Sequence, residues 1–234
     1  MTEHLYRSDA YLTSCEATVT GITADGVTLD RSVFYPTGGG QPGDNGVLRW
    51  AGGSAAIATA IKGENETIIH VLAEGAVPPP AGTTVTAELD AAARAGYRRV
   101  HTALHLLSVA IPLPVTGGSI SVAKGRLDFA MPEPPEDKES LTALLNDLIV
   151  ADHSVTEEWI TDEELAANPG LVKTMSVKPP TGQGRVRLVR IGEIDLQPCG
   201  GTHVRSTAEI GRVRIGKVEK KGKINRRVYL HLDE

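Results

Sequence analysis

Short runs of apolar and β-branched residues, separated by turn residues, fill the first third of the chain and predict β-strands. These runs cover residues 16–20, 27–29, 47–50, 55–61, 67–72 and 83–89. Ala24-Asp25-Gly26 predicts a hairpin turn between the first two runs. Val77-Pro78-Pro79-Pro80 predicts a stiff, extended segment, either a domain linker or a loop before the last strand.

The apolar spacing changes from two to three or four residues after residue 90, which predicts a helix. Asp90 can cap a helix that starts at Ala91 and continues to about Ala110, since Pro112 and Pro114 prevent further extension. We place a domain boundary near residue 90. The core-facing stripe of this helix is predicted to contain Val100, Ala103, Leu104, Leu107 and Ala110.

The rest of the chain mixes strand and helix patterns. Strands are predicted at 118–122, 126–130, 185–191 and 194–197, with a terminal hairpin of 210–218 and 226–232. A helix is predicted from Glu136 to about Asp152, and a short one from Thr161 or Asp162 to before Pro169. The longer helix is expected to bury Leu141, Leu144, Leu145, Leu148 and Ile149. These elements predict an α+β fold with helices packed on an antiparallel sheet.

Composition and charge narrow the class of protein. With 234 residues, 41% hydrophobic and 23% charged, the chain is typical of a globular protein of one or two domains. It has no apolar run of membrane-spanning length, no secretory signal and only two distant cysteines, so we expect a reducing, cytoplasmic location.

The overall charge of −5 hides an asymmetry between the two ends of the chain. Residues 1–170 carry 10 basic and 23 acidic side chains, whereas residues 171–234 carry 14 basic and 6 acidic ones. The basic residues predict either contacts with a polyanion or a solvated strand face. The candidate residues for contact with a polyanion are Lys217, Lys220, Lys221, Lys223 and Arg226.

Two short clusters carry the candidate chemistry, His101-Thr-Ala-Leu-His105 and Cys199-Gly-Gly-Thr-His203. The spacing of the first pair places both imidazoles on one helix face, and the glycines of the second favour a turn. Either cluster alone is compatible with chance or with core histidines, but together they predict one four-ligand metal site. Nitrogen and sulfur ligands favour zinc. The glutamate of an HExxH motif is missing, so peptide hydrolysis of that type is not expected.

A second candidate is the glycine-rich loop Phe34-Tyr-Pro-Thr-Gly-Gly-Gly-Gln-Pro-Gly-Asp44. It lacks a Walker lysine and the GxGxxG spacing, so we expect no nucleotide cofactor. Two interpretations stay open: a flexible surface turn, or a loop whose backbone approaches a ligand closely with Gln41 as a directed amide.

The glycine-rich loop, the HTALH helix, the strand Arg126-Leu-Asp-Phe129 and the segment Gln197-Pro-Cys-Gly-Gly-Thr-His203 occur in one order over nearly the whole chain. In this respect the chain resembles the editing domain of alanyl-tRNA synthetase and its free-standing AlaX relatives of the medium type. The threonyl-tRNA synthetase editing domain shares the metal motifs, and the loop favours the alanine branch.

The resemblance implies a small β-rich, barrel-like domain (residues 1–89) and an α+β editing domain (residues 90–234). It implies hydrolysis, in trans, of tRNA(Ala) mischarged with serine and sometimes glycine. No synthetase core precedes the editing module in this chain, so it is not expected to charge tRNA. The implied ligands of a single zinc ion are His101, His105, Cys199 and His203.

Further candidate site residues are predicted beside the metal ligands. We expect His101, His105 and Gln41 to take part in catalysis. The expected substrate-binding residues are Ser32, Gly38, Gly39, Gly40, Gln41, Gly200, Gly201 and Thr202. Ser32 stands where the family often has threonine, and its alternative role is a local hydrogen bond; Thr37 stands where the family often has glutamate or serine.

Two questions about function stay open at this stage. With four protein ligands the zinc site is closed, and with three it keeps a position for water. The rival functions are threonyl-type editing and a non-catalytic, structural-zinc module that binds RNA.

Overall fold

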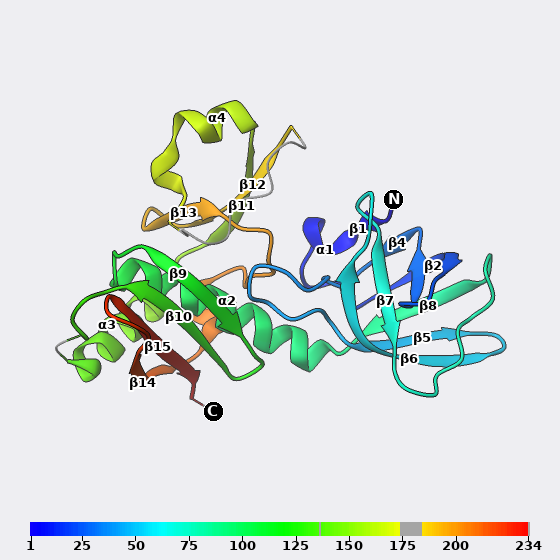
Figure 1. The fold of residues 1–234 in the computed structure, drawn as a ribbon, viewed down its shortest axis with the longest axis horizontal. Helices are drawn as coiled ribbons and strands as arrows, with labels where there is room; N and C mark the ends of the chain where they lie inside the picture. Colours follow the sequence, from blue (N-terminus) through cyan, green and yellow to red (C-terminus); the bar gives the residue numbers. More distant parts are fainter. Residues whose placement is uncertain (136, 174–183, 234) are drawn as a thin grey trace. The chain divides into compact units, whose positions relative to one another are not determined.

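The computed structural model describes residues 1–135, 137–173 and 184–233 and divides the chain into two compact units, Met1–Ala95 and Gly96–Glu234 (Figure 1). Helix α2 (Ala91–Ala110) contributes residues to both. Within the described residues, no helix is both long enough and apolar enough to cross a membrane.

The first unit is a closed barrel of six strands. Its order is β2 (Ser14–Ile22), β3 (Val27–Leu29), β7 (Ile68–Leu72), β6 (Gly53–Lys62), β5 (Gly46–Trp50) and β8 (Thr84–Leu89). Alternate residues of these strands point inward and form one buried cluster, as period-two patterns require. The predicted β-rich, barrel-like fold is therefore confirmed. The proline segment joins β7 to β8 of the same barrel, so it is a loop and not a domain linker.

The amino terminus adds elements that the sequence patterns did not predict. Strand β1 (Glu3–His4) pairs in parallel with β4 (Arg31–Ser32), and a short helix α1 (Leu5–Ser8) follows β1. These segments are too short to show a period, so only their tertiary pairing defines them.

The predicted central helix is confirmed over its whole length. Asp90 Oδ1 accepts a hydrogen bond from the backbone N–H of Ala93 at 3.0 Å, which caps the first turn. Val100, Leu104 and Leu107 are buried in the core of the second unit, as their spacing predicts.

The second unit contains an antiparallel sheet with helices α2 and α3 in its core. The strand order is β14 (Val213–Lys220), β15 (Asn225–Leu232), β10 (Lys124–Ala130) and β9 (Val115–Ile120). Helix α3 (Lys138–Val150) begins after Asp137, whose side chain caps it by accepting from Glu139 N and Ser140 N. The expected burial of Leu144 is wrong, because this side chain is 45% exposed on the outer face of α3.

A three-stranded antiparallel sheet completes this unit. It consists of β11 (Val155–Ile160), β12 (Val186–Ile191) and β13 (Asp195–Pro198). Helix α4 (Asp162–Ala167) follows β11 with a capping box at Thr161, and the 3-10 helix η1 (Pro169–Leu171) follows α4. The sequence patterns missed β11, because its polar centre hides the strand period.

The last predicted hairpin starts later than expected. A 3-10 helix η2 (Thr207–Ile210) occupies the residues before it, and Gly211 adopts φ of +73°. The backbone therefore turns at Gly211, and β14 begins at Val213 instead of Ile210.

Candidate metal centre

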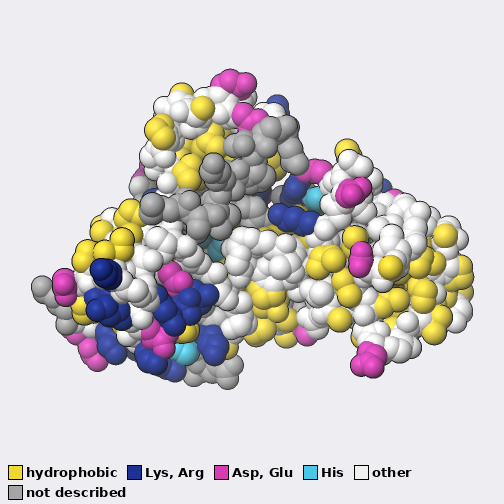
Figure 2. All heavy atoms as spheres, viewed as in Figure 1, with side chains coloured by type: hydrophobic (Ala, Val, Ile, Leu, Met, Phe, Trp, Pro, Cys, Tyr) yellow, Lys and Arg dark blue, Asp and Glu magenta, His cyan; other side chains and the backbone are white. Residues whose placement is uncertain are grey.

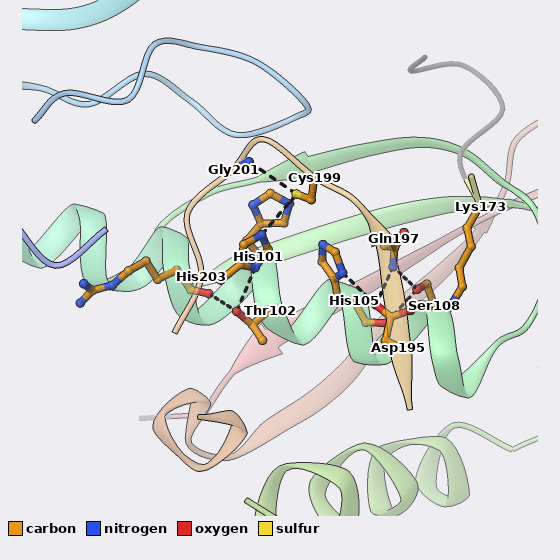
Figure 3. Close-up of polar contacts among 11 residues, drawn as sticks. His101, Thr102, His105, Ser108, Lys173, Asp195, Gln197, Cys199, Gly201 and His203 are labelled. Atoms are coloured by element: carbon orange, nitrogen blue, oxygen red, sulfur yellow. Dashed lines mark hydrogen bonds and ion pairs between the residues drawn. The ribbon is translucent and has the colours of Figure 1, made fainter. Parts of the chain in front are cut away.

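The two predicted ligand pairs lie together in the second unit (Figure 3). Helix α2 presents His101 and His105 one turn apart, and the loop after β13 brings Cys199 and His203 to them. The four candidate ligand atoms all lie within 4.8 Å of one another. Helical spacing therefore accounts for one pair, and the position of β13 beside α2 accounts for the other.

The dimensions of this cluster suit a zinc ion. Cys199 Sγ lies 3.5 Å from His101 Nε2 and 3.2 Å from His203 Nε2. A zinc tetrahedron with usual Zn–S and Zn–N bond lengths has edges of about 3.5 Å between sulfur and nitrogen. The three histidines are also buried, which favours coordination over hydration. Donor types, spacing and burial thus fit one zinc ion held by these four residues.

Two of the imidazoles are oriented by partners on their other nitrogen. His105 Nδ1 lies 3.0 Å from Asp195 Oδ2, and His203 Nδ1 lies 3.2 Å from Thr102 Oγ1. With Nδ1 engaged, Nε2 of each ring faces the other ligands, as is usual for metal-binding histidines.

Asp195 has further partners that hold its carboxylate in place. Lys173 Nζ donates to Oδ1 at 2.5 Å and Gln197 Nε2 donates to Oδ2 at 2.7 Å. Sequence reasoning missed Asp195, Lys173 and Thr102 as parts of the site. The signal for Asp195 was an aspartate two positions before Gln197 on the strand that leads to the Cys199 ligand.

The pKa values show that the ligands are electrostatically coupled. Burial lowers the pKa of His105, but hydrogen bonds to Asp195 and Cys199 outweigh it and raise the pKa to about 9. Burial and the charge of His101 lower the pKa of His203 to about 3.

The pKa values of the two acidic groups of the cluster, Cys199 and Asp195, are both lowered. Burial opposes ionisation of Cys199, yet the charges of His101 and His203 hold its thiol pKa well below the usual value. Burial likewise opposes ionisation of Asp195, but His105 and Lys173 lower its pKa to about 2. The cluster thus favours a thiolate on Cys199 and a neutral His203, whereas His105 must release a proton when a metal binds.

The loop that carries Cys199 is held by an arginine of β12. Arg187 Nη1 donates to the carbonyl oxygens of Cys199 and Gly201, each at 2.9 Å, and Nη2 bonds Glu157 Oε1. Gly201 and Thr202 are buried, whereas Gly200 is exposed with open space where a Cβ would lie. Of the predicted substrate residues in this loop, Gly200 therefore offers an accessible backbone.

The glycine-rich loop with Gln41 belongs to the first unit, whereas the four candidate metal ligands belong to the second. Gly38 and Gln41 exchange backbone hydrogen bonds, with positive φ at Gly39 (+57°) and Gly40 (+81°) between them. The loop is thus a tight turn, in which the glycines have a conformational reason. The Gln41 side chain is buried, and its role in the reaction remains a prediction.

Ser32 makes local hydrogen bonds in the barrel unit. Its Oγ lies 2.7 Å from His70 Nε2 and accepts from Phe34 N at 3.1 Å, while His70 Nδ1 lies 3.0 Å from Val27 O. Nδ1 donates to that carbonyl, so Nε2 accepts from the serine. The local role considered for Ser32 is therefore present, and contact with substrate remains a prediction.

The candidate tRNA-binding residues lie on the β14–β15 hairpin, in a region where Figure 2 shows lysine and arginine side chains gathered. Lys217 and Lys221 pair with Glu219, and Lys220 and Lys223 are exposed. Arg226 differs from them: it is buried, and its guanidinium donates to the carbonyl oxygens of Asn225 and Pro132. The hairpin thus offers lysines to a polyanion, whereas Arg226 serves the packing of β15.

Two family models match separate parts of the chain. Residues 186–229, from β12 to β15, match the threonyl and alanyl tRNA synthetase second additional domain. Residues 10–93 match the model of class II (A) tRNA synthetases.

Individual relatives match along nearly the full length. The chain is 34% identical to the alanyl-tRNA editing protein AlaX-M of Methanosarcina acetivorans, over 99% of both chains. It is 35% identical to the AlaX-M protein of Saccharolobus solfataricus, over 98% of both. The alanine–tRNA ligase of Archaeoglobus fulgidus is 36% identical, over 93% of this chain and 24% of the ligase. Together with the paired histidine and cysteine motifs, these full-length matches show that the chain belongs to the AlaX-M family of alanyl-tRNA editing proteins.

Proposed function

We propose that this protein is a trans-editing deacylase that hydrolyses the ester bond of mischarged tRNA(Ala). Its substrates are chiefly Ser-tRNA(Ala) and also Gly-tRNA(Ala), and the reaction takes place beside one zinc ion. The observation that carries the proposal is the buried set of His101, His105, Cys199 and His203 in a chain whose full-length relatives are alanyl-tRNA editing proteins.

The residues of the chain prepare this centre for an ester substrate. When bound, zinc supplies a Lewis acid next to the ester carbonyl. Asp195 holds the proton of His105 on Nδ1, and Thr102 orients His203. Arg187 fixes the Cys199–Gly201 backbone, so the exposed Gly200 backbone is available to position the aminoacyl group.

A deacylation assay tests this proposal directly. Zinc-loaded protein is mixed with Ser-tRNA(Ala) or Ala-tRNA(Ala), and loss of the ester is followed. We expect fast loss of serine, slow loss of alanine and a rate near that of buffer with His101→Ala. If Ser-tRNA(Ala) decays no faster with the wild-type protein than in buffer, the proposed function is wrong.

Threonyl-type editing is the first alternative, because the second additional domain is common to both synthetases. The same assay with Ser-tRNA(Thr) separates the two, since the proposal requires tRNA(Ala) to be the preferred substrate. Faster hydrolysis of Ser-tRNA(Thr) would favour the alternative.

A structural zinc site in a non-catalytic RNA-binding module is the second alternative. Removing the metal with a chelator distinguishes this alternative from the proposed deacylase. A purely structural zinc holds the fold, so its removal unfolds the domain, whereas an editing centre loses activity before it loses secondary structure. The leucine-rich cluster around α2 and α3 supplies the second unit with a core of its own. We therefore expect circular dichroism to be largely retained after chelation, with no deacylation.

The exposed lysines of the β14–β15 hairpin are proposed to bind the tRNA backbone. Reversing the charges of Lys220, Lys221 and Lys223 is expected to weaken tRNA binding and to flatten its salt dependence. Lys138→Glu on α3 is the control for a general change in charge. Unchanged binding by the triple variant would assign these lysines to a solvated face.

A further inference from the structure

Trp159 on β11 is exposed in a chain that buries or half-buries every other aromatic residue. The chain has two tryptophans, five tyrosines and two phenylalanines, all within the described residues. Trp159 is the most exposed of these nine side chains, with 47% of its surface open to solvent. An indole in water lacks the large stabilisation that burial of its apolar surface would give, so the exposure of Trp159 calls for a functional explanation.

Its place is defined by the register of the three-stranded sheet. Trp159 on β11 lies directly opposite Arg187 on β12. On the opposite edge of β12, the backbone N–H of Cys199, just after β13, donates to Arg187 O at 3.1 Å. Trp159, Arg187 and Cys199 therefore form one row across the sheet (β11 to β13 in Figure 1). Two inter-strand spacings separate the backbone of the indole from that of the cysteine ligand, a distance of about 10 Å.

The indole also lies on the face of this sheet that carries the metal centre. Residues opposite each other in an antiparallel pair point to the same side, so Trp159 shares a face with Arg187. The side chains of Asp195 and Gln197 lie on this face too, by their register with β12, and Asp195 contacts His105. The opposite face carries the separate ion pair of Arg190 with Glu158.

The acidic neighbours of Trp159 do not make this face repellent to RNA. Glu157 shares this face and pairs with Arg187, while Glu158 points to the opposite face and pairs with Arg190, so both carboxylates have a compensating charge. Arg187 is already committed to Glu157 and to the loop carbonyls. In this row, the side chain with an open planar surface is the indole.

We propose that Trp159 is the stacking platform for an unpaired nucleobase at the 3′ end of the tRNA substrate. This inference rests on the proposed function, which places the ester of the terminal ribose beside the zinc ligands. The base of that nucleotide then lies about the length of one nucleoside from the ester. This length is comparable to the distance of about 10 Å between the backbones of Trp159 and Cys199. Stacking on an aromatic ring holds a base without reading its sequence.

Kinetics with substitutions at Trp159 test the role of the indole. We expect Trp159→Ala to lower kcat/KM for Ser-tRNA(Ala) by about 5- to 150-fold, mainly through KM, as loss of one base–aromatic stack does. Trp159→Phe should retain most of the activity, and Trp159→Leu should not. Thr156→Ala, on the opposite face of β11, is the matched control. Zinc content and unfolding midpoint should match the wild type in all four variants.

Fluorescence gives a readout that does not depend on deacylation. Trp50→Phe leaves Trp159 as the only indole of the chain. Titration with uncharged tRNA(Ala) should quench its emission, and the same tRNA without its 3′ CCA should not. A failure of wild-type deacylation with CCA-dependent quenching intact would overturn the proposed function and leave the stacking site standing.

Three results would overturn the stacking proposal. The first is quenching that is equal with and without the 3′ CCA, and the second is no quenching while tRNA still binds. The third is a Trp159→Ala variant with wild-type kcat/KM but altered self-association in sedimentation, which would assign the indole to a protein contact.

Discussion

At the level of single side chains, the geometry of the metal centre depends on groups that do not touch the metal. Asp195 accepts from His105 and is itself held by Lys173 and Gln197. Such a carboxylate keeps the imidazole in one tautomer and makes it a better ligand.

Asp195→Asn tests the role of this carboxylate. We expect zinc affinity to fall by about 10- to 100-fold, because the charge beside His105 is lost while the shape is kept. Competition with a chromogenic chelator measures the affinity. Lys173→Met is the graded control: it leaves the Asp195 carboxylate on His105, so it should lower zinc affinity less. An equal loss of affinity in both variants would contradict the larger role given to Asp195.

His70 in the barrel predicts a dependence of stability on pH. Burial lowers its pKa from 6.5 to about 4, against the hydrogen bond to Val27 O that raises it. The unfolded chain therefore binds a proton at a pH where the folded chain does not. The stabilisation is complete above pH 6.5 and is lost as pH falls toward 4, by about 3 kcal/mol in total.

Urea unfolding between pH 7 and pH 4.5 measures this effect. His70→Gln should remove the corresponding part of the decline, while the Tyr229→Phe variant should retain it. Identical pH profiles for wild type and His70→Gln would show that the imidazole is not buried in the neutral form.

At the level of elements, the start of α2 is tied to the glycine-rich loop by a buried ion pair. Arg94 Nε donates to Asp44 Oδ1 at 3.1 Å, and its Nη2 contacts Asp44 Oδ2 and donates to Val33 O. Arg94 Nη1 donates to Ala10 O at 3.1 Å. One guanidinium thus joins the helix, the loop and the amino-terminal segment of the barrel unit.

Arg94→Met should destabilise the barrel unit by about 3–5 kcal/mol, because it leaves Asp44 buried without its partner. The double variant Arg94→Met with Asp44→Asn should recover part of this loss. Thermal unfolding followed by Trp50 fluorescence makes the comparison, since Trp50 lies in this unit. A single variant as stable as the wild type would mean that the pair contributes no net stability.

At the level of the whole molecule, each unit has its own buried apolar cluster. The metal ligands all belong to the second unit. A ligand stabilises only the structure that binds it, by about 4 kcal/mol at a thousand times its dissociation constant.

Chelation should therefore lower the unfolding temperature of the second unit and leave that of the barrel unchanged. The two tryptophans report the units separately: Trp159→Phe leaves Trp50 in the barrel, and Trp50→Phe leaves Trp159 in the second unit. Equal shifts for both reporters would show that the two units unfold as one.

Much of this fold was predictable because its patterns are local. The spacing of apolar residues and the cap at Asp90 define α2, and the alternation in the barrel strands defines their inward faces. Strand β11 was missed, since its central Thr-Glu-Glu carries no apolar alternation. The pairing of those glutamates with arginines of β12 becomes visible only with the sheet assembled.

Local patterns along the chain were enough to predict the four candidate ligands, because two residues one helical turn apart and a glycine-spaced pair are recognisable from their spacing. The folded arrangement was needed to show that Asp195 and Thr102 orient the imidazoles, that Ser32 bonds His70, and that Trp159 lies in the same row as Cys199. The physical reason is range. Periodicity determines which residues share a face of one element, whereas contacts between residues far apart in the chain depend on strand register and helix packing, which no local pattern encodes.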